Sequence, residues 1–296
     1  MQVHRVMSLL LVVLFAVTCA PEPAPCPAWQ PPALRGRVED EALREVSGLA
    51  ASRLHPGILW ALQDSGGEGR NVLWALHHDG RVAGRLTVDA PNQDWEALAV
   101  GPCSTGWCLF VGDIGDNTAS RASVAVLRIP EPVVLAAQMR VTPEVLPARY
   151  PDGPQDAEAL VVTPDGEVVV LTKRTDGTAR IMVLDEAAQL FGDHGGLDVS
   201  RGGVGGLPSA VTDASLSAQG TVLLVRTYLG AWEFFLPNAA LADLSTAARD
   251  GVPFVPQLQT EAVAQDPVQP GYWQMAEGPR PRMWLSRCLV ARSSHP

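Results

Sequence analysis

The sequence predicts an all-β protein folded as a single β-propeller with five blades. Three observations support this: short Val-, Leu- and Trp-rich runs bounded by turns, a unit that recurs along the chain, and little 3.6-residue periodicity. Only "EAAQLF" and "NAALADLSTAARD" have the composition of helices. Hairpin turns are expected at Asp79-Gly80, Asp165-Gly166 and Asp176-Gly177.

The length and charge of the chain limit what it can bind. Its 296 residues provide enough apolar sequence for one large core. The net charge of −10 and the pI near 5.0 leave no clustered Lys and Arg for a phosphate backbone. The sequence therefore predicts no nucleic-acid partner.

The N-terminus has the features of an export signal. Residues 1–19 contain a basic start, a short apolar run and a small-residue end. The stretch "AVTC" ending at Cys19 resembles a bacterial lipoprotein cleavage box, with ordinary signal cleavage as the alternative. Residues 20–32 are rich in proline and are expected to form a tether. We expect the propeller at residues 33–292, in the cell envelope and anchored through a lipid at Cys19, or secreted.

The cysteines are consistent with an oxidising compartment. Cys103 and Cys108 are close enough in sequence to cross-link one hairpin. If Cys19 carries the lipid, Cys26 and Cys288 remain to tie the two ends of the domain together. Metal ligation by cysteine is disfavoured because no CxxC motif occurs.

Five units define the predicted blades. Each begins with an acidic residue followed by an apolar strand, and the equivalent apolar positions are predicted to be Leu49, Leu98, Leu160, Leu216 and Val263. Two further strands follow in each unit, and "RGRVED" is expected to add an outer strand to the last blade and close the ring. Six blades with one degenerate, a β-sandwich and a two-sheet solenoid remain alternatives.

The propeller topology predicts where the charges gather. The start of each first strand and the end of each second strand lie at the same mouth of the channel. The acids and Asn expected there as metal ligands are Glu45, Asp64, Glu96, Asp113, Asp116, Asn117, Glu158, Asp213 and Glu261. The residues expected to bind a ligand beside them are Lys173, which is the only lysine in the chain, Arg174, Arg226 and Glu277.

So many carboxylates at one mouth require compensation by protons, bases or a cation. Oxygen ligands of this kind suit Ca²⁺, and the basic groups suit an anionic or oxygen-rich molecule. Glu96 and Glu158 are the predicted catalytic groups for attack on an ester, lactone or phosphoester. Alternatively, each acid only caps a turn of its blade by accepting backbone N–H bonds.

Several motifs together resemble bacterial exported propellers related to the phytase-like esterase families. They are "EVSGLAAS", "QDSGG", "DWEALAV", "GDIGDN", "DAEALVV", "TKR" and "RTY", which cover most of residues 40–285. The resemblance implies a propeller with oxygen-lined metal sites at the channel mouth, and it implies no particular substrate. Ala214 departs from the pattern, because the other central blades have Glu at the position aligned with it.

The sequence thus predicts an envelope propeller that binds Ca²⁺ and a small oxygen-rich or phosphate-bearing molecule, and that acts as a metal-dependent hydrolase if it is an enzyme. The alternative function is a non-catalytic scaffold that binds protein or polysaccharide.

Overall fold

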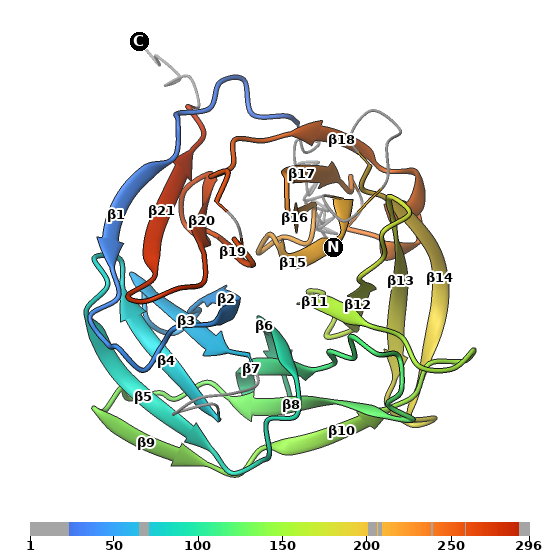
Figure 1. The fold of residues 1–296 in the computed structure, drawn as a ribbon, viewed down its shortest axis with the longest axis horizontal. Helices are drawn as coiled ribbons and strands as arrows, with labels where there is room; N and C mark the ends of the chain where they lie inside the picture. Colours follow the sequence, from blue (N-terminus) through green and yellow to red (C-terminus); the bar gives the residue numbers. More distant parts are fainter. Residues whose placement is uncertain are drawn as a thin grey trace, which may run out of the picture.

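The structure is a computed structural model that describes residues 24–64, 71–200, 206, 209–237, 239–257 and 259–289. Within these ranges the strands form five sheets arranged around a central axis (Figure 1), and their strands are antiparallel except for one parallel pair in the first sheet. The predicted five-bladed propeller is therefore confirmed. The signal segment, Cys19 and the Ser65-Gly66-Gly67 part of "QDSGG" lie outside the described residues. No helix in the described part is long and apolar enough to cross a bilayer.

The blades follow one another along the chain, and each is numbered by its order. Blade 1 contains β2 (Val46–Ala51), β3 (Ile58–Gln63), β4 (Val72–His77), β5 (Val82–Val88) and, in parallel with β5, β9 (Gln138–Val141). Blade 2 contains β6 (Trp95–Cys103), β7 (Gly106–Asp113), β8 (Val124–Pro130) and β10 (Glu144–Ala148). Blade 3 contains β11 (Ala157–Val162), β12 (Val168–Thr172), β13 (Thr178–Asp185) and β14 (Leu190–Asp198).

Blades 4 and 5 complete the ring. Blade 4 contains β15 (Val211–Leu216), β16 (Val222–Thr227), β17 (Gly230–Phe235) and β18 (Ala248–Gly251), with the 3₁₀ helix η2 (Leu241–Thr246) before β18. Blade 5 contains β19 (Ala262–Gln265), β20 (Gly271–Met275), β21 (Arg282–Arg287) and the N-terminal β1 (Ala33–Arg37). Because β1 pairs with β21, blade 5 is built from both ends of the chain, as the sequence predicts.

Both predicted disulfides are present. Cys26 is bonded to Cys288, which reinforces the closure of blade 5, and Cys103 is bonded to Cys108 across the β6–β7 hairpin. Trp29 forms a β-bridge with Cys288. The second half of the predicted tether therefore packs against β21.

Each seam between neighbouring blades contains an apolar cluster. Large side chains such as Trp60, Trp74 and Phe110 are fully buried there, since the faces of adjacent sheets pack against each other. Among the described residues, the cluster between blades 4 and 5 is the smallest of the five. Polar contacts, such as those between Gln265 and Ser215, occupy part of that seam.

Two local predictions need correction. The segment "EAAQLF" forms the turn between β13 and β14 and the start of β14, because β-strand pairing of Leu184 with Phe191 requires a tight hairpin there. Within "NAALADLSTAARD" only η2 is helical, and the segment then continues into β18. The three predicted Asp-Gly turns occur, with φ of 93° at Gly80, 91° at Gly166 and 85° at Gly177.

Candidate functional site

The backbone register shows which acidic positions are equivalent between blades. The amide of Asp64 donates to the carbonyl of Glu45, and the amide of Lys173 donates in the same way to Asp156. In blade 2 the amide of Gly115 donates to the carbonyl of Asp94. Glu45, Asp94 and Asp156 therefore occupy one position of the repeat, two residues before the position of Glu96 and Glu158.

The second acidic position coincides with a shift in strand register. The pairing of β6 with β7 shifts between Trp95 and Ala97, and that of β11 with β12 between Ala157 and Ala159, so the extra residues are Glu96 and Glu158. The corresponding residues in blades 1 and 4 are Ser47 and Thr212. In blade 5 the amide of Glu277 donates to the carbonyl of Gln259, which places Glu261 at the same position of the repeat.

This register corrects the alignment expected from sequence. In blade 4, Ala214 pairs with Val225, as Leu98 pairs with Val111 in blade 2. The residue equivalent to Leu98 is therefore Ala214, and not Leu216 as expected from sequence. Ala214 thus has no acidic counterpart, and Thr212 takes the place of Glu96. The hydroxyls of Ser47 and Thr212 instead donate to backbone carbonyls of the next blade.

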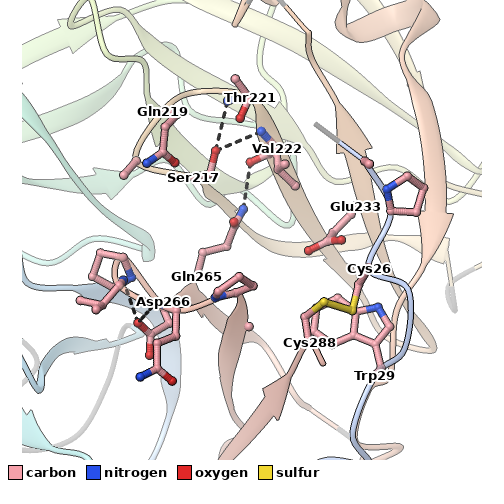
Figure 2. A pocket seen from close by; sticks show the side chains of 18 of the residues that line it. Cys26, Trp29, Ser217, Gln219, Thr221, Val222, Glu233, Gln265, Asp266 and Cys288 are labelled. Atoms are coloured by element: carbon pink, nitrogen blue, oxygen red, sulfur yellow. Dashed lines mark hydrogen bonds between the residues drawn. A yellow bond between two sulfur atoms is a disulfide. The ribbon is translucent and has the colours of Figure 1, made fainter. Parts of the chain in front are cut away.

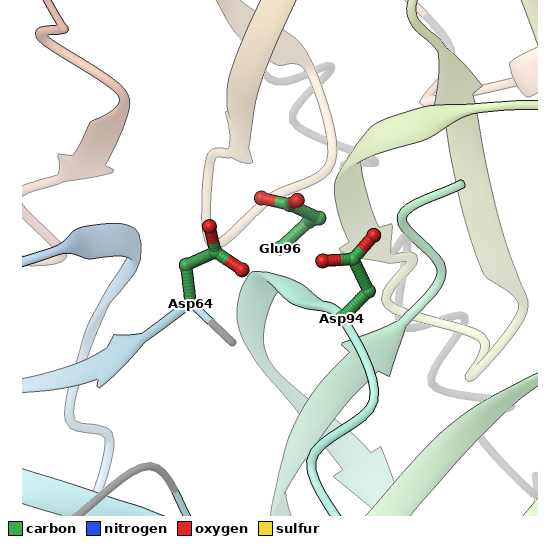
Figure 3. Close-up of side chains that lie close together, drawn as sticks. All are labelled: Asp64, Asp94 and Glu96. Atoms are coloured by element: carbon green, nitrogen blue, oxygen red, sulfur yellow. The ribbon is translucent and has the colours of Figure 1, made fainter. Parts of the chain in front are cut away.

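Three carboxylates from blades 1 and 2 converge at the mouth (Figure 3). Asp64 follows β3, Asp94 precedes β6, and Glu96 lies at the register shift in β6. One oxygen from each lies within 4.8 Å of the others. Two oxygens on opposite sides of a Ca²⁺ ion are about 4.6–5.2 Å apart, so this acidic trio fits a cation of that size without rearrangement of the backbone.

Neighbouring residues hold the trio in place. Buried Asn92 accepts from the amide of Trp95 and donates to the carbonyl of Gln63, which joins the end of β3 to the start of β6. Gly115 leaves room for the trio, because a Cβ there would lie 2.6 Å from the carboxylate of Asp94 and 2.8 Å from Cγ of Glu96. The sequence "GDIGDN" therefore supplies space beside the trio at Gly115.

The electrostatics of Glu96 explain why the trio favours a cation. Its side chain is 4% exposed. Burial, followed by the charges of Glu158, Asp64 and Asp94, raises the pKa of Glu96 well above its usual range. Two ionised carboxylates 4.8 Å apart repel by about 3.5 kcal/mol at an effective dielectric constant of about 20. A proton or a metal ion must relieve this repulsion.

Blade 3 contributes an acid and a base to the same mouth. Lys173 forms an ion pair with Glu158, and the Lys173 side chain is 15% exposed. Burial raises the pKa of Glu158 to about 8, although Lys173 opposes the shift. Burial by itself would lower the pKa of Lys173, but the nearby Glu158 outweighs burial and raises this pKa above its usual range. The amine therefore stays charged. Tyr228 of blade 4 lies beside this pair, with Lys173 Nζ 5.6 Å from its ring centroid.

Blade 5 places two further carboxyls at the mouth. Glu261 and Glu277 are joined by a side-chain hydrogen bond, which requires a proton between them. Burial, then Glu261, Asp64 and Glu45, raises the pKa of Glu277 to about 8. Glu45 itself is exposed at the rim.

Three predicted metal ligands in blade 2 have local partners. Asp113 forms an ion pair with Arg121 at 2.9 Å and accepts from the amide of Asp94 at 3.1 Å. Asp116 accepts from the amides of Ser120 at 2.9 Å and Arg121 at 2.7 Å, which shapes the loop after β7. Asn117 is exposed on that loop. The structure does not bring these three side chains into the trio.

The structure does not place Arg226, a member of the expected ligand-binding set, at the mouth. Its side chain is fully buried, and its guanidinium donates to the carbonyls of Gly230 at 3.0 Å and Val255 at 3.2 Å. Burial lowers its pKa to about 10. Arg174, the next member of that set, is half exposed and pairs with Asp176 two residues away. Among the predicted basic residues, Lys173 is the one beside the trio.

Asp213 lies at the centre of the channel. It is fully buried and accepts from the amides of Ala214 at 2.8 Å and Val263 at 2.7 Å, and also from that of Leu49. It therefore joins the first strands of three blades. Burial raises its pKa, although these amides oppose the shift. Farther along the axis, described residues of the first strands line a cavity of about 30 Å³, which has room for little more than a water molecule.

Sequence reasoning missed Asp94, Asp156 and Tyr228. The first two are visible in the paired motifs "DWE" and "DAE", where only the second acid was selected. Tyr228 follows the last residue of β16 as Lys173 follows the last residue of β12. Aligning Thr172-Lys173 with Thr227-Tyr228 identifies Tyr228 and excludes Arg226.

Comparison with known proteins shows the fold alone. No protein-family model and no curated protein matches the chain. Similar solved structures include the PQQ-bound aldose sugar dehydrogenase from Streptomyces coelicolor, with 10% identity, a TM-score of 0.52, and coverage of 89% of this chain and 99% of that chain. Glutaminyl cyclase from Myxococcus xanthus has 10% identity and a TM-score of 0.47, with coverage of 88% and 100%. The Swd1 β-propeller domain from Myceliophteria thermophila has 14% identity and a TM-score of 0.43, with coverage of 83% and 84%.

Proposed function

We propose that this protein is an exported, lipid-anchored β-propeller whose channel mouth binds Ca²⁺ together with a small oxygen-rich or phosphate-bearing molecule. The observation that supports this most directly is the convergence of Asp64, Asp94 and Glu96. Their sequence context also resembles that of the phytase-like propellers. All three offer hard oxygen donors, which Ca²⁺ prefers.

The charges around the trio favour a divalent cation over a permanent internal counter-ion. Lys173 is already engaged by Glu158, and Arg121 by Asp113. The raised pKa of Glu96 shows that protonation is the alternative way to remove the repulsion. A cation that replaces this proton gains the attraction of all three carboxylates.

The position of the organic ligand follows from the groups beside the trio. Lys173 has three N–H donors and uses one on Glu158. The phenol of Tyr228 lies close to the same amine. A phosphate or polyhydroxyl group placed between the cation and Lys173 would contact both. We therefore place the ligand over blades 2, 3 and 4.

Hydrolysis of that ligand is the second candidate function. It is favoured by the pKa of Glu158, about 8, because a carboxyl that titrates near neutral pH can take and return a proton. A bound divalent cation supplies Lewis-acid polarisation of a carbonyl or phosphoryl oxygen. Glu158 would accept the proton at a carboxylate oxygen, and Lys173 would orient the substrate.

The route of the N-terminal arm suits an anchored protein. Trp29 bridges to Cys288, which follows the C-terminal end of β21, whereas Asp64 and Glu96 lie at the other ends of their blades. The arm therefore leaves the propeller on the face opposite the mouth. A lipid at Cys19 would leave the trio facing away from the membrane.

A calcium titration of the purified protein tests the proposal. We expect Ca²⁺ to raise the melting temperature, EDTA to reverse the effect, and Asp64→Asn or Glu96→Gln to reduce it at the same Ca²⁺ concentration. Asp165→Asn is the matched control, because it removes one exposed carboxylate from the opposite face. If no divalent ion shifts the transition of a folded wild-type protein, the metal site is refuted and the scaffold function is favoured.

A panel of esters, lactones and phosphoesters tests hydrolysis separately. Turnover that is lost in Glu158→Gln while Ca²⁺ still stabilises the variant would support the catalytic role. Ca²⁺ binding without turnover of any member would leave binding as the function and refute hydrolysis of these classes.

A further inference from the structure

A cavity of about 450 Å³ lies at the seam of blades 4 and 5, on the face opposite the acidic mouth (Figure 2). One wall is the N-terminal arm with Cys26 and Trp29. The other walls are the β15–β16 turn, the β19–β20 turn and the face of β17. Its volume is in the range that holds small organic ligands. We call it the seam cavity.

The seam cavity contains a carboxylate with no cationic partner. Glu233 of β17 is partly buried and, among the described residues, makes no hydrogen bond or ion pair. Its register partner on β18 is Asp250, so two like charges face each other across the strands. Burial, with Asp250 as the second cause, raises the pKa of Glu233 to about 7. Figure 2 shows the carboxylate facing the arm that carries Cys26.

The remaining walls are mainly apolar. The ring of Trp29 is held edge-on to Tyr272, with centroids 5.4 Å apart. Val268, which also lines the cavity, is 74% exposed, and prolines of the arm and of the β19–β20 turn contribute further surface. The other acid of the cavity, Asp266, is already paired with Arg287 at 2.8 Å. The cavity thus combines one unpaired negative charge with an aromatic and aliphatic lining.

We propose that the seam cavity binds a small organic cation, with an ammonium group paired to Glu233 and its apolar part packed against Trp29. Ammonium groups gain from both a carboxylate and an aromatic face. A hard metal ion is disfavoured because it requires six or more oxygen ligands. An anion would be repelled by Glu233 and Asp250.

The site depends on closure of the ring. The arm that carries Trp29 is held by the Cys26–Cys288 disulfide and by the amide of Gln30, which donates to the carbonyl of Arg287. Reduction of this disulfide would release one wall of the seam cavity. We therefore expect ligand binding and protection of the disulfide from reduction to occur together.

Calorimetry with choline and benzyltrimethylammonium, in EDTA so that the mouth holds no metal, tests the proposal. We expect Glu233→Gln to weaken binding at least tenfold and Asp165→Asn to leave it unchanged. The neutral isostere 3,3-dimethyl-1-butanol should bind at least tenfold more weakly than choline. Glu233→Gln should fold, because it removes the like-charge pair with Asp250.

The pH dependence gives an independent readout. With a pKa of about 7, Glu233 is roughly 90% ionised at pH 8 and 10% ionised at pH 6. Binding should therefore weaken about ninefold between these values in the wild type and stay flat in Glu233→Gln. The other titratable groups around it are Asp250 of β18, Tyr272 of β20 and Asp266. Burial raises the pKa of Tyr272, so its phenol stays neutral between pH 6 and 8. Burial opposes the lowering of the pKa of Asp266, but backbone amides and Arg287 outweigh it, so Asp266 stays charged.

A choline headgroup in a membrane has the same chemistry, so phosphatidylcholine vesicles form a second arm of the test. Binding to free choline assigns a soluble ligand, and binding only to vesicles, lost in Glu233→Gln, assigns a lipid headgroup. The proposal is overturned if Glu233→Gln binds as tightly as the wild type, if the neutral isostere equals choline, or if neither free cations nor vesicles bind.

Discussion

Replacement of Glu96 by Gln is the most informative single change at the mouth. Gln has the same shape as the protonated Glu that the raised pKa implies, and it cannot become a carboxylate. In the wild type, Ca²⁺ must displace this proton before three carboxylates can bind it. We therefore expect Ca²⁺ binding to release more protons in the wild type than in Glu96→Gln.

The magnitudes follow from the geometry of the trio. With oxygens within 4.8 Å, each ionised pair costs about 3.5 kcal/mol, and Glu96 forms two such pairs with Asp64 and Asp94. Ca²⁺ at 100 times its Kd stabilises the folded state by about 2.7 kcal/mol, which corresponds to a Tm increase of about 5–11 °C for a domain of this size. In Glu96→Gln the affinity for Ca²⁺ should fall at least tenfold. Loss of a residue that only hydrogen-bonds a metal ligand already lowers metal affinity by about 10- to 100-fold.

Isothermal titration calorimetry in two buffers with different ionisation enthalpies measures both the Kd and the proton count. Without Ca²⁺, the stability of the variant relative to the wild type should increase as the pH rises, because only the wild-type group can ionise. Equal proton release by the two proteins, or an unchanged Kd in the variant, would refute this account of the trio.

Other changes test the surroundings of the trio and the channel. Gly115→Ala should weaken Ca²⁺ binding at least tenfold, whereas Gly196→Ala, whose added methyl meets no atom closer than 4.0 Å, should not; equal affinities would contradict the proposed close packing. Asp213→Ala leaves buried amides without an acceptor and should destabilise the fold by about 3 kcal/mol in urea unfolding; a loss below about 1 kcal/mol would argue against this role. Because burial raises the pKa of Glu158 and Glu277 to about 8, metal-free stability should be greatest below about pH 4.5 for these two groups and fall as the pH rises to about 8. Thermal melts from pH 5 to 8.5 in EDTA measure this, and the decline should shrink in Glu277→Gln.

Much of the fold follows from the sequence. Alternating apolar strands, Asp-Gly turns and a recurring unit require sheets that bury both faces, and a ring of such sheets is the arrangement that lets every unit do so. The positions of Cys26 and Cys288 at the two ends of the domain then predict the closing bond. These features are local or periodic, so they can be read without coordinates.

The gathering of acids at one mouth also follows from the sequence, because strand order alone brings the ends of β3 and the start of β6 together. The identity of the residues that meet there does not. A shift of one residue moves a side chain to the opposite face of a strand, and the register shift at Glu96 and Glu158 cannot be located from composition. Arg226 lies one residue before the end of β16, so its side chain is buried and does not reach the mouth.

The sequence by itself determined the all-β class, the number of units, the closure and the pairing of the cysteines. The tertiary structure decided that Asp94 joins Asp64 and Glu96, that Asp113 supports the backbone, and that Asp213 fills the channel. The physical reason is that unpaired backbone amides along the channel and neighbouring charges compete for each carboxylate. Which of them prevails depends on distances between blades that are far apart in the sequence.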